Sequence, residues 1–358
     1  MKKIAYVGND VHQDSITTSV YVGEEREPSI ERKMLNERKA VEKFYKRLSQ
    51  EYEVRACYEA SSNGYVFYRW LKELGISCEV IAPSLIPEKR GDRQKTDQRD
   101  ARKLGRYYRS GDLTTIKVPS EKEEASRSLL RLREQMSREV RNAKQYLLKF
   151  LQLRGLTYKE GTNWTVKHRK YLKGLKFEER LERRVFDEYM LMLAYQEEAL
   201  KKIDDEIYTL AYGEEYRERV ERLTMLRGVK ETTAMGLITE IVDFKRFSRP
   251  REMMAYLGLI PGERSSGEEQ KFTGITKAGN PRVRRLMVEA AWHYRHKPVI
   301  KKRSGSDLDE SWKIAQKAQS RLHDKYWRLI QKGKCKTKAV TAVARELTGF
   351  IWAIMRTV

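Results

Sequence analysis

Four acidic residues in the N-terminal third of this chain have the types and the spacing needed to hold metal ions. They are Asp10, Glu59, Asp97 and Asp100. The last two are three residues apart within a helical pattern, which places both side chains on one helix face. Like charges so close repel one another, so a neutralising partner is expected. Mg²⁺ or Mn²⁺, hard cations that prefer oxygen ligands, would suit carboxylates without histidine or cysteine.

Each acid taken alone has a simpler explanation. Aspartate is common at helix N-termini, where it interacts favourably with the helix dipole, and acids at strand ends are often solvated surface. The combination favours chemistry instead, because Asp10 follows an apolar run at residues 4–8 and Glu59 closes another at 54–58, and both runs predict buried strands. Carboxylates from two strand ends and one helix face form the arrangement that a two-metal phosphodiester site needs, with ions ~4 Å apart.

Residues 1–118 alternate strand and helix patterns, which predicts an α/β sheet with helices on its faces. We expect strands at residues 4–8, 15–22, 54–58, 78–82 and 113–118, and helices at 38–52, 65–74 and 97–109. The active site of such a sheet lies beyond its strand ends, where the acids fall.

The charge balance indicates the partner. Among 358 residues, 74 are Lys or Arg and 51 are Asp or Glu, so the formal net charge is +23. A chain so basic attracts a phosphate backbone, and its binding should weaken steeply with salt. An anionic membrane surface is the less favoured partner, because the basic residues are spread along the chain rather than concentrated on one amphipathic helix.

Cysteine usage and hydropathy indicate the compartment. Cys57, Cys78 and Cys335 show no CxxC spacing, so a zinc ribbon and a disulfide framework are both disfavoured, which fits a reducing cytosol. No apolar run approaches the ~20 residues of a membrane span, and the run after the N-terminal lysines is too short for a signal peptide. We expect a cytoplasmic protein without a membrane partner.

Two long helices are expected in residues 119–213. On the first, apolar residues recur every three or four positions while the other faces are basic, including Arg131, Arg138 and Lys144. A solvated face and a nucleic-acid contact explain this about equally well. The second helix keeps a strict three-and-four alternation with the polar Gln196 in the seam, which predicts a coiled coil. The apolar seam of the second helix could be buried either against the first helix or in a dimer.

The remainder, residues 214–358, is expected to be helical. Residues 226–234 are similar to the hairpin of a helix-hairpin-helix, although an ordinary corner between helices fits as well. Residues 258–267 predict a loop that ends in Ser265-Ser266-Gly267, and a turn then precedes a helix whose start carries Arg282, Arg284 and Arg285. Cations there oppose the helix dipole, so a bound phosphate would explain them. A loop serine beside it could attack a phosphodiester, although Ser-Ser-Gly is usually turn material.

The acid-containing segments and the later serine- and arginine-containing segments, taken in their order along the chain, resemble the motifs of the DEDD insertion-sequence transposases. These are the bridge-RNA-guided recombinases, which are related to site-specific DNA invertases. The resemblance runs from about residue 4 to 296. It is carried by Gly8-Asn9-Asp10, Tyr58-Glu59-Ala60 and residues 95–101, and later by 258–261, Ser265-Ser266-Gly267 and 275–285. Asn9 departs from the family, which more often has an apolar residue there.

The resemblance implies an α/β plus all-α chain: a RuvC-like ribonuclease-H-fold domain at 1–118, coiled-coil helices at 119–213, and a helical transposase domain at 214–358. It implies that Asp10, Glu59, Asp97 and Asp100 bind the metal, and that Ser266 is the nucleophile, with Ser265 the alternative. The implied partners are donor and target DNA, an element-encoded bridge RNA and further copies of the chain, from dimer to tetramer, in a bacterial or archaeal nucleoid. The residues expected to bind nucleic acid are Arg264, Lys277, Arg282, Arg284, Arg285, Arg131, Arg138 and Lys144.

The expected reaction is transesterification through a covalent 5′-phosphoserine, which stores bond energy for religation. RNA pairing would choose the sequence while basic residues hold the backbones. Three alternatives stay open: a hydrolytic junction nuclease that uses the acids alone, a protein-read invertase, and a non-catalytic nucleic-acid scaffold.

Overall fold

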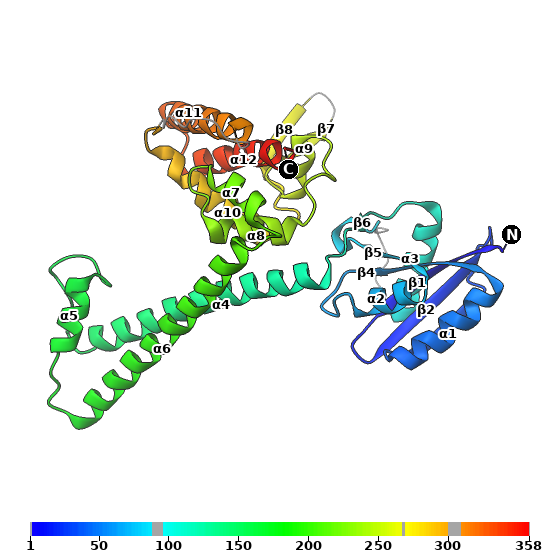
Figure 1. Cartoon of the computed structure of the whole chain (residues 1–358), viewed down its shortest axis with the longest axis horizontal. Coiled ribbons are helices and arrows are strands. Elements are labelled where there is room, and N and C mark those ends of the chain that lie inside the picture. Colours follow the sequence, from blue (N-terminus) through cyan, green and yellow to red (C-terminus); the bar gives the residue numbers. More distant parts are fainter. Residues whose placement is uncertain (1, 88–95, 267–268, 300–308, 358) are drawn as a thin grey trace. The chain divides into compact units, whose positions relative to one another are not determined.

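The computed structural model describes residues 2–87, 96–266, 269–299 and 309–357, with the backbone alone at 264–266, 269–271 and 309. The chain forms two compact units, Met1–Pro119 and Ser120–Val358 (Figure 1). The first is built on a mixed sheet and the second is mainly helical. A further division of the second unit near Gly213 stays a prediction.

The sheet of the first unit has six strands in the order β3-β2-β1-β4-β5-β6. The strands β1, β4 and β5 are parallel, while β2, β3 and β6 pair antiparallel with their neighbours. A parallel connection needs a crossover, and helices α1 and α2 provide the two crossovers. The strands are β1 (Ile4–Val11), β2 (Ser15–Val22), β3 (Ile30–Leu35), β4 (Glu53–Glu59), β5 (Ser77–Ile81) and β6 (Thr115–Ile116). This topology is consistent with a ribonuclease-H-like domain.

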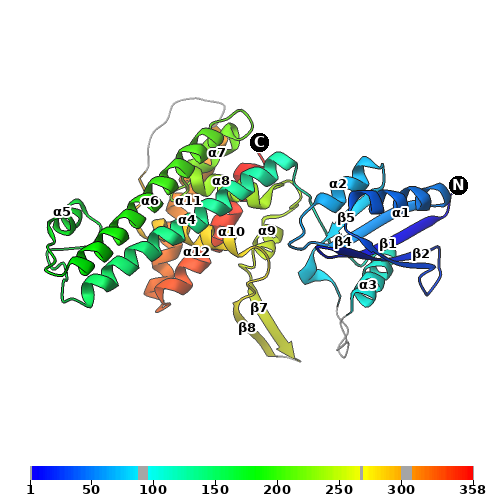
Figure 2. The ribbon, with the colours of Figure 1, turned by 90° about the horizontal axis from the view of Figure 1, so that it is seen from below.

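Helices cover both faces of the sheet: α1 (Arg38–Glu51) and α2 (Val66–Glu73) lie on one face and α3 (Asp97–Ser110) on the other (Figure 2). A short 3₁₀ turn, η1 (Pro83–Leu85), follows β5. Alternation along the strands divides the side chains between the two faces. On β1, Val7 packs with α1 and α2, whereas an added Cβ at Gly8 would lie 2.2 Å from the backbone nitrogen of Gly105 in α3. Asp10 therefore belongs to the α3 face.

The residue before Asp10, Asn9, is fully buried on the opposite face. Its side-chain amide nitrogen donates to the carbonyl of Cys57 at 3.0 Å. Its oxygen accepts from the hydroxyls of Thr18, at 2.9 Å, and Tyr45, at 2.8 Å. This polar side chain is thus fully satisfied, as a buried amide must be to avoid a desolvation penalty, and it ties together β1, β2, β4 and α1.

Strand β3 was not expected from the sequence. Only Met34 of its six residues is buried, so the apolar alternation that reveals a half-buried strand is absent. Its pairing with β2 places Lys33 opposite Thr17, and Thr17 lies opposite Asp10. These three residues form a row across the sheet on the α3 face.

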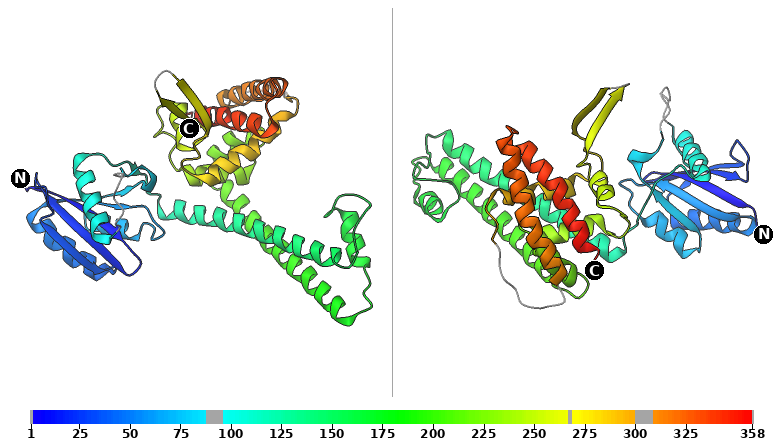
Figure 3. Two further views of the ribbon diagram at one scale, coloured as in Figure 1. Left: turned by 180° about the vertical axis from the view of Figure 1, so that it is seen from behind. Right: turned by 90° about the horizontal axis from the view of Figure 1, so that it is seen from above.

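The helical unit begins with two long helices, α4 (Glu121–Gln152) and α6 (Arg180–Ala211), which pack on each other and are joined through α5 (Val166–Gly174) (Figure 3). A capping box of Ser120 and Glu123 starts α4. Ion pairs from α4 and from the residues just after it run in opposite order along α6: Arg133–Asp204, Lys144–Glu197 and, beyond the end of α4, Arg154–Glu182. The helices are therefore antiparallel. Packing on α4 within the chain buries at least part of the apolar seam of α6 from which a coiled coil was predicted.

The rest of the unit surrounds a second large core. Its elements are α7 (Arg217–Thr224), α8 (Glu231–Ile241), α9 (Pro250–Tyr256), β7 (Pro261–Ser266), β8 (Glu269–Ile275), α10 (Pro281–Ala291), η2 (Trp292–Arg295), α11 (Asp309–Gln331) and α12 (Lys336–Met355). The loop expected at residues 258–267 was wrong in part, because β7 and β8 form an antiparallel hairpin there. Proline, glycines and adjacent serines concealed the strand, since they break the alternation by which strands are recognised.

Candidate active site

Local structure directs three of the acids toward one place on the α3 face. Asp10 occupies the penultimate position of β1. Thr96 caps α3 by accepting from the backbone nitrogen of Arg99, so that Asp97 is the first helical residue. Asp100 follows within the first turn and shares a helix face with Asp97.

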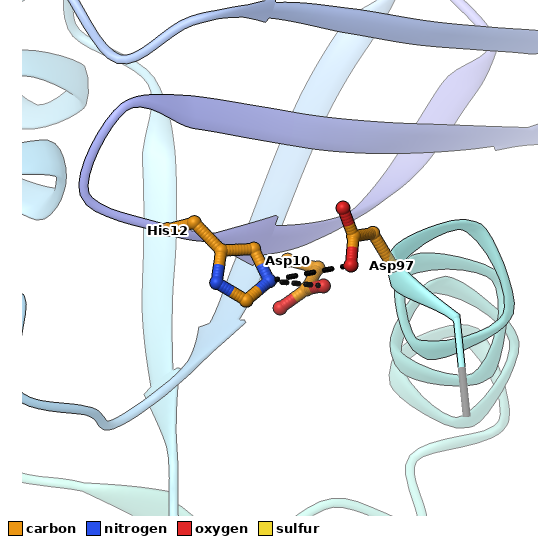
Figure 4. A group of neighbouring side chains, drawn as sticks. All are labelled: Asp10, His12 and Asp97. Atoms are coloured by element: carbon orange, nitrogen blue, oxygen red, sulfur yellow. Dashed lines mark hydrogen bonds and ion pairs between the residues drawn. The ribbon is translucent and has the colours of Figure 1, made fainter.

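The side chains of Asp10, Asp97 and His12 converge (Figure 4). The Nε2 atom of His12 lies 3.1 Å from Oδ2 of Asp10 and 3.5 Å from Oδ1 of Asp97. One ligand atom from each of the three residues lies within 4.8 Å of the others. Asp10 is 20% exposed and His12 is 55% exposed, so the group opens to solvent. This group can hold a divalent metal ion.

The charges of the acids act on one another. Burial raises the pKa of Asp10; His12 opposes this shift, and the charges of Asp100 and Asp97 add to it. The pKa of Asp97 is lowered, chiefly by a hydrogen bond from Lys33, whose Nζ lies 3.1 Å from Oδ2 of Asp97. A raised carboxylate pKa marks unfavourable negative charge, which a cation would relieve.

Glu59 and Asp100 lie outside the group of three ligand atoms. Glu59 is the last residue of β4, and the preceding Tyr58 is paired with Asn9 in the parallel register. Its position is therefore next to Asp10 along the same strand ends, and alternation assigns it to the same face, with its side chain exposed. The structure thus brings Asp10 and Asp97 into a metal-binding distance, while the proposed ligand roles of Glu59 and Asp100 rest on their positions nearby.

The donor set fits a divalent cation. Carboxylate oxygens suit Mg²⁺ and Mn²⁺, and an imidazole is better tolerated by Mn²⁺ than by Mg²⁺. Thr17 adds an independent sign: its Oγ1 is buried beside Asp10 and has no hydrogen-bond partner among the described residues. A hydroxyl left without a partner at this position can be satisfied by a metal-bound water.

The sequence reasoning missed two residues at this site, His12 and Lys33. His12 is two positions after Asp10, so the period of a strand extended past β1 could have placed it on the same side. Lys33 carried no such signal, because the strand that presents it was itself unexpected. Only the pairing of β3 with β2 brings Lys33 to the acids.

Most residues expected to bind nucleic acid make contacts inside the helical unit. Arg131 pairs with the buried Glu240 at 2.8 Å, and Lys144 pairs with Glu197 at 2.9 Å. Three more lie at the start of α10. There Arg282 and Arg285 both contact Glu134, at 3.1 and 3.4 Å. These ion pairs neither support nor contradict a role of the four residues in nucleic-acid binding, which stays a prediction.

Arg284, also on α10, donates to the backbone carbonyls of Leu257 and Ala278, both at 2.9 Å. Arg138 is exposed on α4, and Lys277 has a left-handed backbone with a φ of 57° before α10. The side chain of Arg264 lies outside the described residues.

Ser266, the expected nucleophile, is the last residue of β7 and is paired with Glu269 across the hairpin. Its side chain and that of Ser265 lie outside the described residues. The acids and this hairpin belong to different units.

In the part of the chain that the structure describes, no helix is long and apolar enough to cross a membrane.

The sheet order and the acids at the ends of β1 and β4, together with two more on α3, are consistent with a ribonuclease-H-like DEDD domain. Comparison with known proteins gives the family. Residues 7–154 match the DEDD transposase model of the IS110 group, and residues 220–305 match the transposase IS116/IS110/IS902 family. The chain belongs to the IS110 family of DEDD insertion-sequence transposases, enzymes that cleave and recombine DNA.

Two relatives extend over most of the chain. A putative transposase y4qE of Sinorhizobium fredii is 42% identical over 88% of this chain and 79% of its own length. The transposase for insertion sequence element IS1533 of Leptospira borgpetersenii is 36% identical over 93% of this chain and 99% of its own. A transposase for insertion sequence element IS1111A of Coxiella burnetii is 24% identical over 65% of this chain and 64% of its own.

Proposed function

We propose that this transposase cuts, exchanges and rejoins DNA strands through a covalent 5′-phosphoserine at Ser266, with Asp10, Glu59, Asp97 and Asp100 holding Mg²⁺ or Mn²⁺. The observation that carries the metal site is the convergence of Asp10 and Asp97 within one group of possible ligands. The serine rests on its motif and on its place within the segment that matches the transposase family.

In the proposed reaction, the Oγ of Ser266 forms a bond to the scissile phosphorus and the bond to the 3′ oxygen breaks. The serine hydroxyl loses its proton, and the departing 3′ oxygen takes one up. The bound cation would polarise the phosphate and lower the cost of the negative charge that develops on it. The acids hold that cation, and the serine stores the phosphodiester energy until a 3′ hydroxyl attacks in the reverse direction.

Ser266 lies outside the unit that contains the acids, and the family resemblance suggests one composite centre that is assembled across subunits. We therefore propose a dimer or tetramer as the active species, with the helices α4 and α6 as its coiled-coil module. The net charge of +23 supports binding of nucleic acid in general. We propose that its partners are donor DNA, target DNA and a bridge RNA that chooses them by base pairing, as the family resemblance implies.

One observation favours a second candidate, a junction nuclease that uses water as its nucleophile. The metal-binding group lies within Met1–Pro119, which is compact by itself. The test is strand cleavage by the full chain with Mg²⁺, copurified RNA and a plasmid that carries the element's ends, together with detection of a protein–DNA adduct. Ser266→Ala should abolish cleavage and adduct, Ser265→Ala should keep both, and Asp10→Asn should lose both. Cleavage without an adduct in Ser266→Ala would establish the nuclease instead, whereas cleavage with an adduct would assign the nucleophile to Ser265.

A further inference from the structure

A cavity of about 480 Å³ lies inside the helical unit, between α4, α8 and α10. Its wall carries six basic side chains and three acidic ones. The basic residues are Arg131, Arg133, Arg141, Lys230, Arg282 and Arg285. The acidic residues are Glu134, Glu240 and Glu289. Three of the residues that the sequence suggested for nucleic-acid contact, Arg131, Arg282 and Arg285, therefore meet at one hollow.

The deepest ion pair gives the cavity a fixed wall. Glu240 is 4% exposed and accepts two hydrogen bonds from Arg131, at 2.8 and 3.0 Å. It also accepts from the side-chain amide of Asn280, at 2.7 Å. A buried carboxylate with three such donors is fully compensated. Arg131 therefore holds the wall in place and is a poor candidate for a ligand contact.

Glu134 is in a different position, because one carboxylate serves two guanidinium groups. It lies 3.1 Å from Arg282 and 3.4 Å from Arg285, whose side chains are 40% and 45% exposed. Each guanidinium carries five N–H donors in a planar fork, so donors remain for a phosphate. Arg285 also contacts Glu289 at 2.9 Å, so both arginines are held in position rather than free to swing.

The rim adds charges that lack such compensation. Arg141 is exposed and donates to the backbone carbonyl of Ser137 at 3.3 Å. Lys230 is exposed at the position that precedes α8. Neither has an acidic partner among the residues that the structure describes. Two cations at the mouth of a hollow, in a protein whose partner is a polyanion, indicate a phosphate contact.

The floor of the cavity is apolar and close-packed. Leu130, Leu286 and Ala290 line it, and an added Cβ at Gly236 would lie 2.7 Å from Leu286. At Gly228, where φ is 80°, an added Cβ would lie 2.5 Å from the carbonyl oxygen of Ala290. The glycine of the segment similar to a helix-hairpin-helix thus serves packing against α10.

We propose that this cavity binds one nucleotide of a single-stranded segment of the nucleic acid, with its phosphate on Arg285, Arg141 and Lys230 and its sugar and base against the apolar floor. The volume is that of a pocket for a small organic ligand and excludes a duplex. Sequence-independent single-strand binding commonly combines such a basic rim with a surface for the base. The inference rests on the proposed function insofar as strand exchange and an RNA guide provide single strands.

The test measures binding rather than cleavage. Full-length protein is titrated into a fluorescein-labelled single-stranded oligonucleotide, as DNA and as RNA, in EDTA, and anisotropy gives the dissociation constant. The double variant Arg141→Glu with Lys230→Glu should weaken binding about tenfold more than a matched double reversal at exposed lysines of α1, Lys39→Glu with Lys43→Glu. Glu134→Gln should strengthen binding several-fold, because it removes a negative charge that lies beside both Arg282 and Arg285.

A variant without charge change separates the cavity from general electrostatics. Thr233→Trp, at the cavity wall, should weaken binding of the single strand while duplex binding stays unchanged, with circular dichroism confirming the fold. If the rim reversals act no more strongly than the α1 reversals, and Thr233→Trp leaves binding unchanged, the proposal is overturned. Ser266→Ala should bind the oligonucleotide normally. The binding assay therefore tests this site separately from the proposed cleavage chemistry.

Discussion

Lys33 and Asp97 form an ion pair at the acid site, with the Nζ of Lys33 3.1 Å from Oδ2 of Asp97. The pair joins an edge strand to the first residue of α3 across 64 positions of sequence. Lys33 therefore supplies positive charge to one of the proposed metal ligands, and it must share or surrender that carboxylate when a cation binds. The ammonium group of Lys33 would therefore compete with a metal ion for the carboxylate of Asp97.

Replacing Lys33 with Met should tighten metal binding. Exposed ion pairs contribute about 0.2–1 kcal/mol, so the dissociation constant for Mn²⁺ should fall by a factor of roughly 1.4 to 5. Isothermal titration calorimetry without nucleic acid measures this directly. Lys39→Met, on the opposite face of the sheet, is the matched control and should change nothing. Weaker binding by Lys33→Met would show that the lysine orients Asp97 for the metal instead.

Replacing His12 with Ala should change the preference between metals. The imidazole lies within reach of Asp10 and Asp97, and it is a better ligand for Mn²⁺ than for Mg²⁺. Affinity for Mn²⁺ should therefore fall more than affinity for Mg²⁺, as measured by Mn²⁺ electron paramagnetic resonance with Mg²⁺ competition. Equal losses for both ions would restrict His12 to a purely electrostatic role.

Replacing Asn9 with the apolar residue Ile should destabilise this chain. The hydroxyls of Thr18 and Tyr45 would lose their acceptor inside the core, at a cost of about 1–3 kcal/mol for each unpaired group. Urea unfolding measures the loss. In a Tyr45→Phe background the same replacement should cost less, because one orphaned hydroxyl is gone. Equal costs in both backgrounds would exclude this explanation.

Acid should weaken the contact between β3 and α3. Hydrogen bonds from Arg102, with smaller contributions from Gln98 and Ser19, lower the pKa of Glu31 from 4.5 to about 2. A lowered pKa stabilises the fold above the unfolded value, and this stabilisation is lost as pH falls from 4.5 toward about 2. The difference in urea midpoint between wild type and Glu31→Gln should shrink across that window. A constant difference would mean that Glu31 stabilises through packing alone.

Much of the first unit could be predicted because its signals are local. The runs before Asp10 and Glu59 are apolar and end at acids, and strands β1 and β4 lie there. The sheet order and β3 could not be predicted, since an exposed strand with one buried residue has no distinctive pattern. In the helical unit the pattern revealed the long helices, while the hairpin at Pro261–Ser266 was hidden by residues typical of turns.

The sequence by itself determined that Asp97 and Asp100 share a helix face and that Asp10 and Glu59 lie at strand ends, because the periods of helix and strand are properties of the local chain. Only the tertiary structure decided that Thr17 lies beside Asp10 and that Lys33 pairs with Asp97, because strand pairing, which depends on distant residues, sets those neighbours. It likewise decided that Arg131 and Arg282, which the sequence suggested for nucleic-acid contact, pair with Glu240 and Glu134. Charge alone predicts that an arginine attracts an anion, whereas the packing of the helices determines which anion lies next to it.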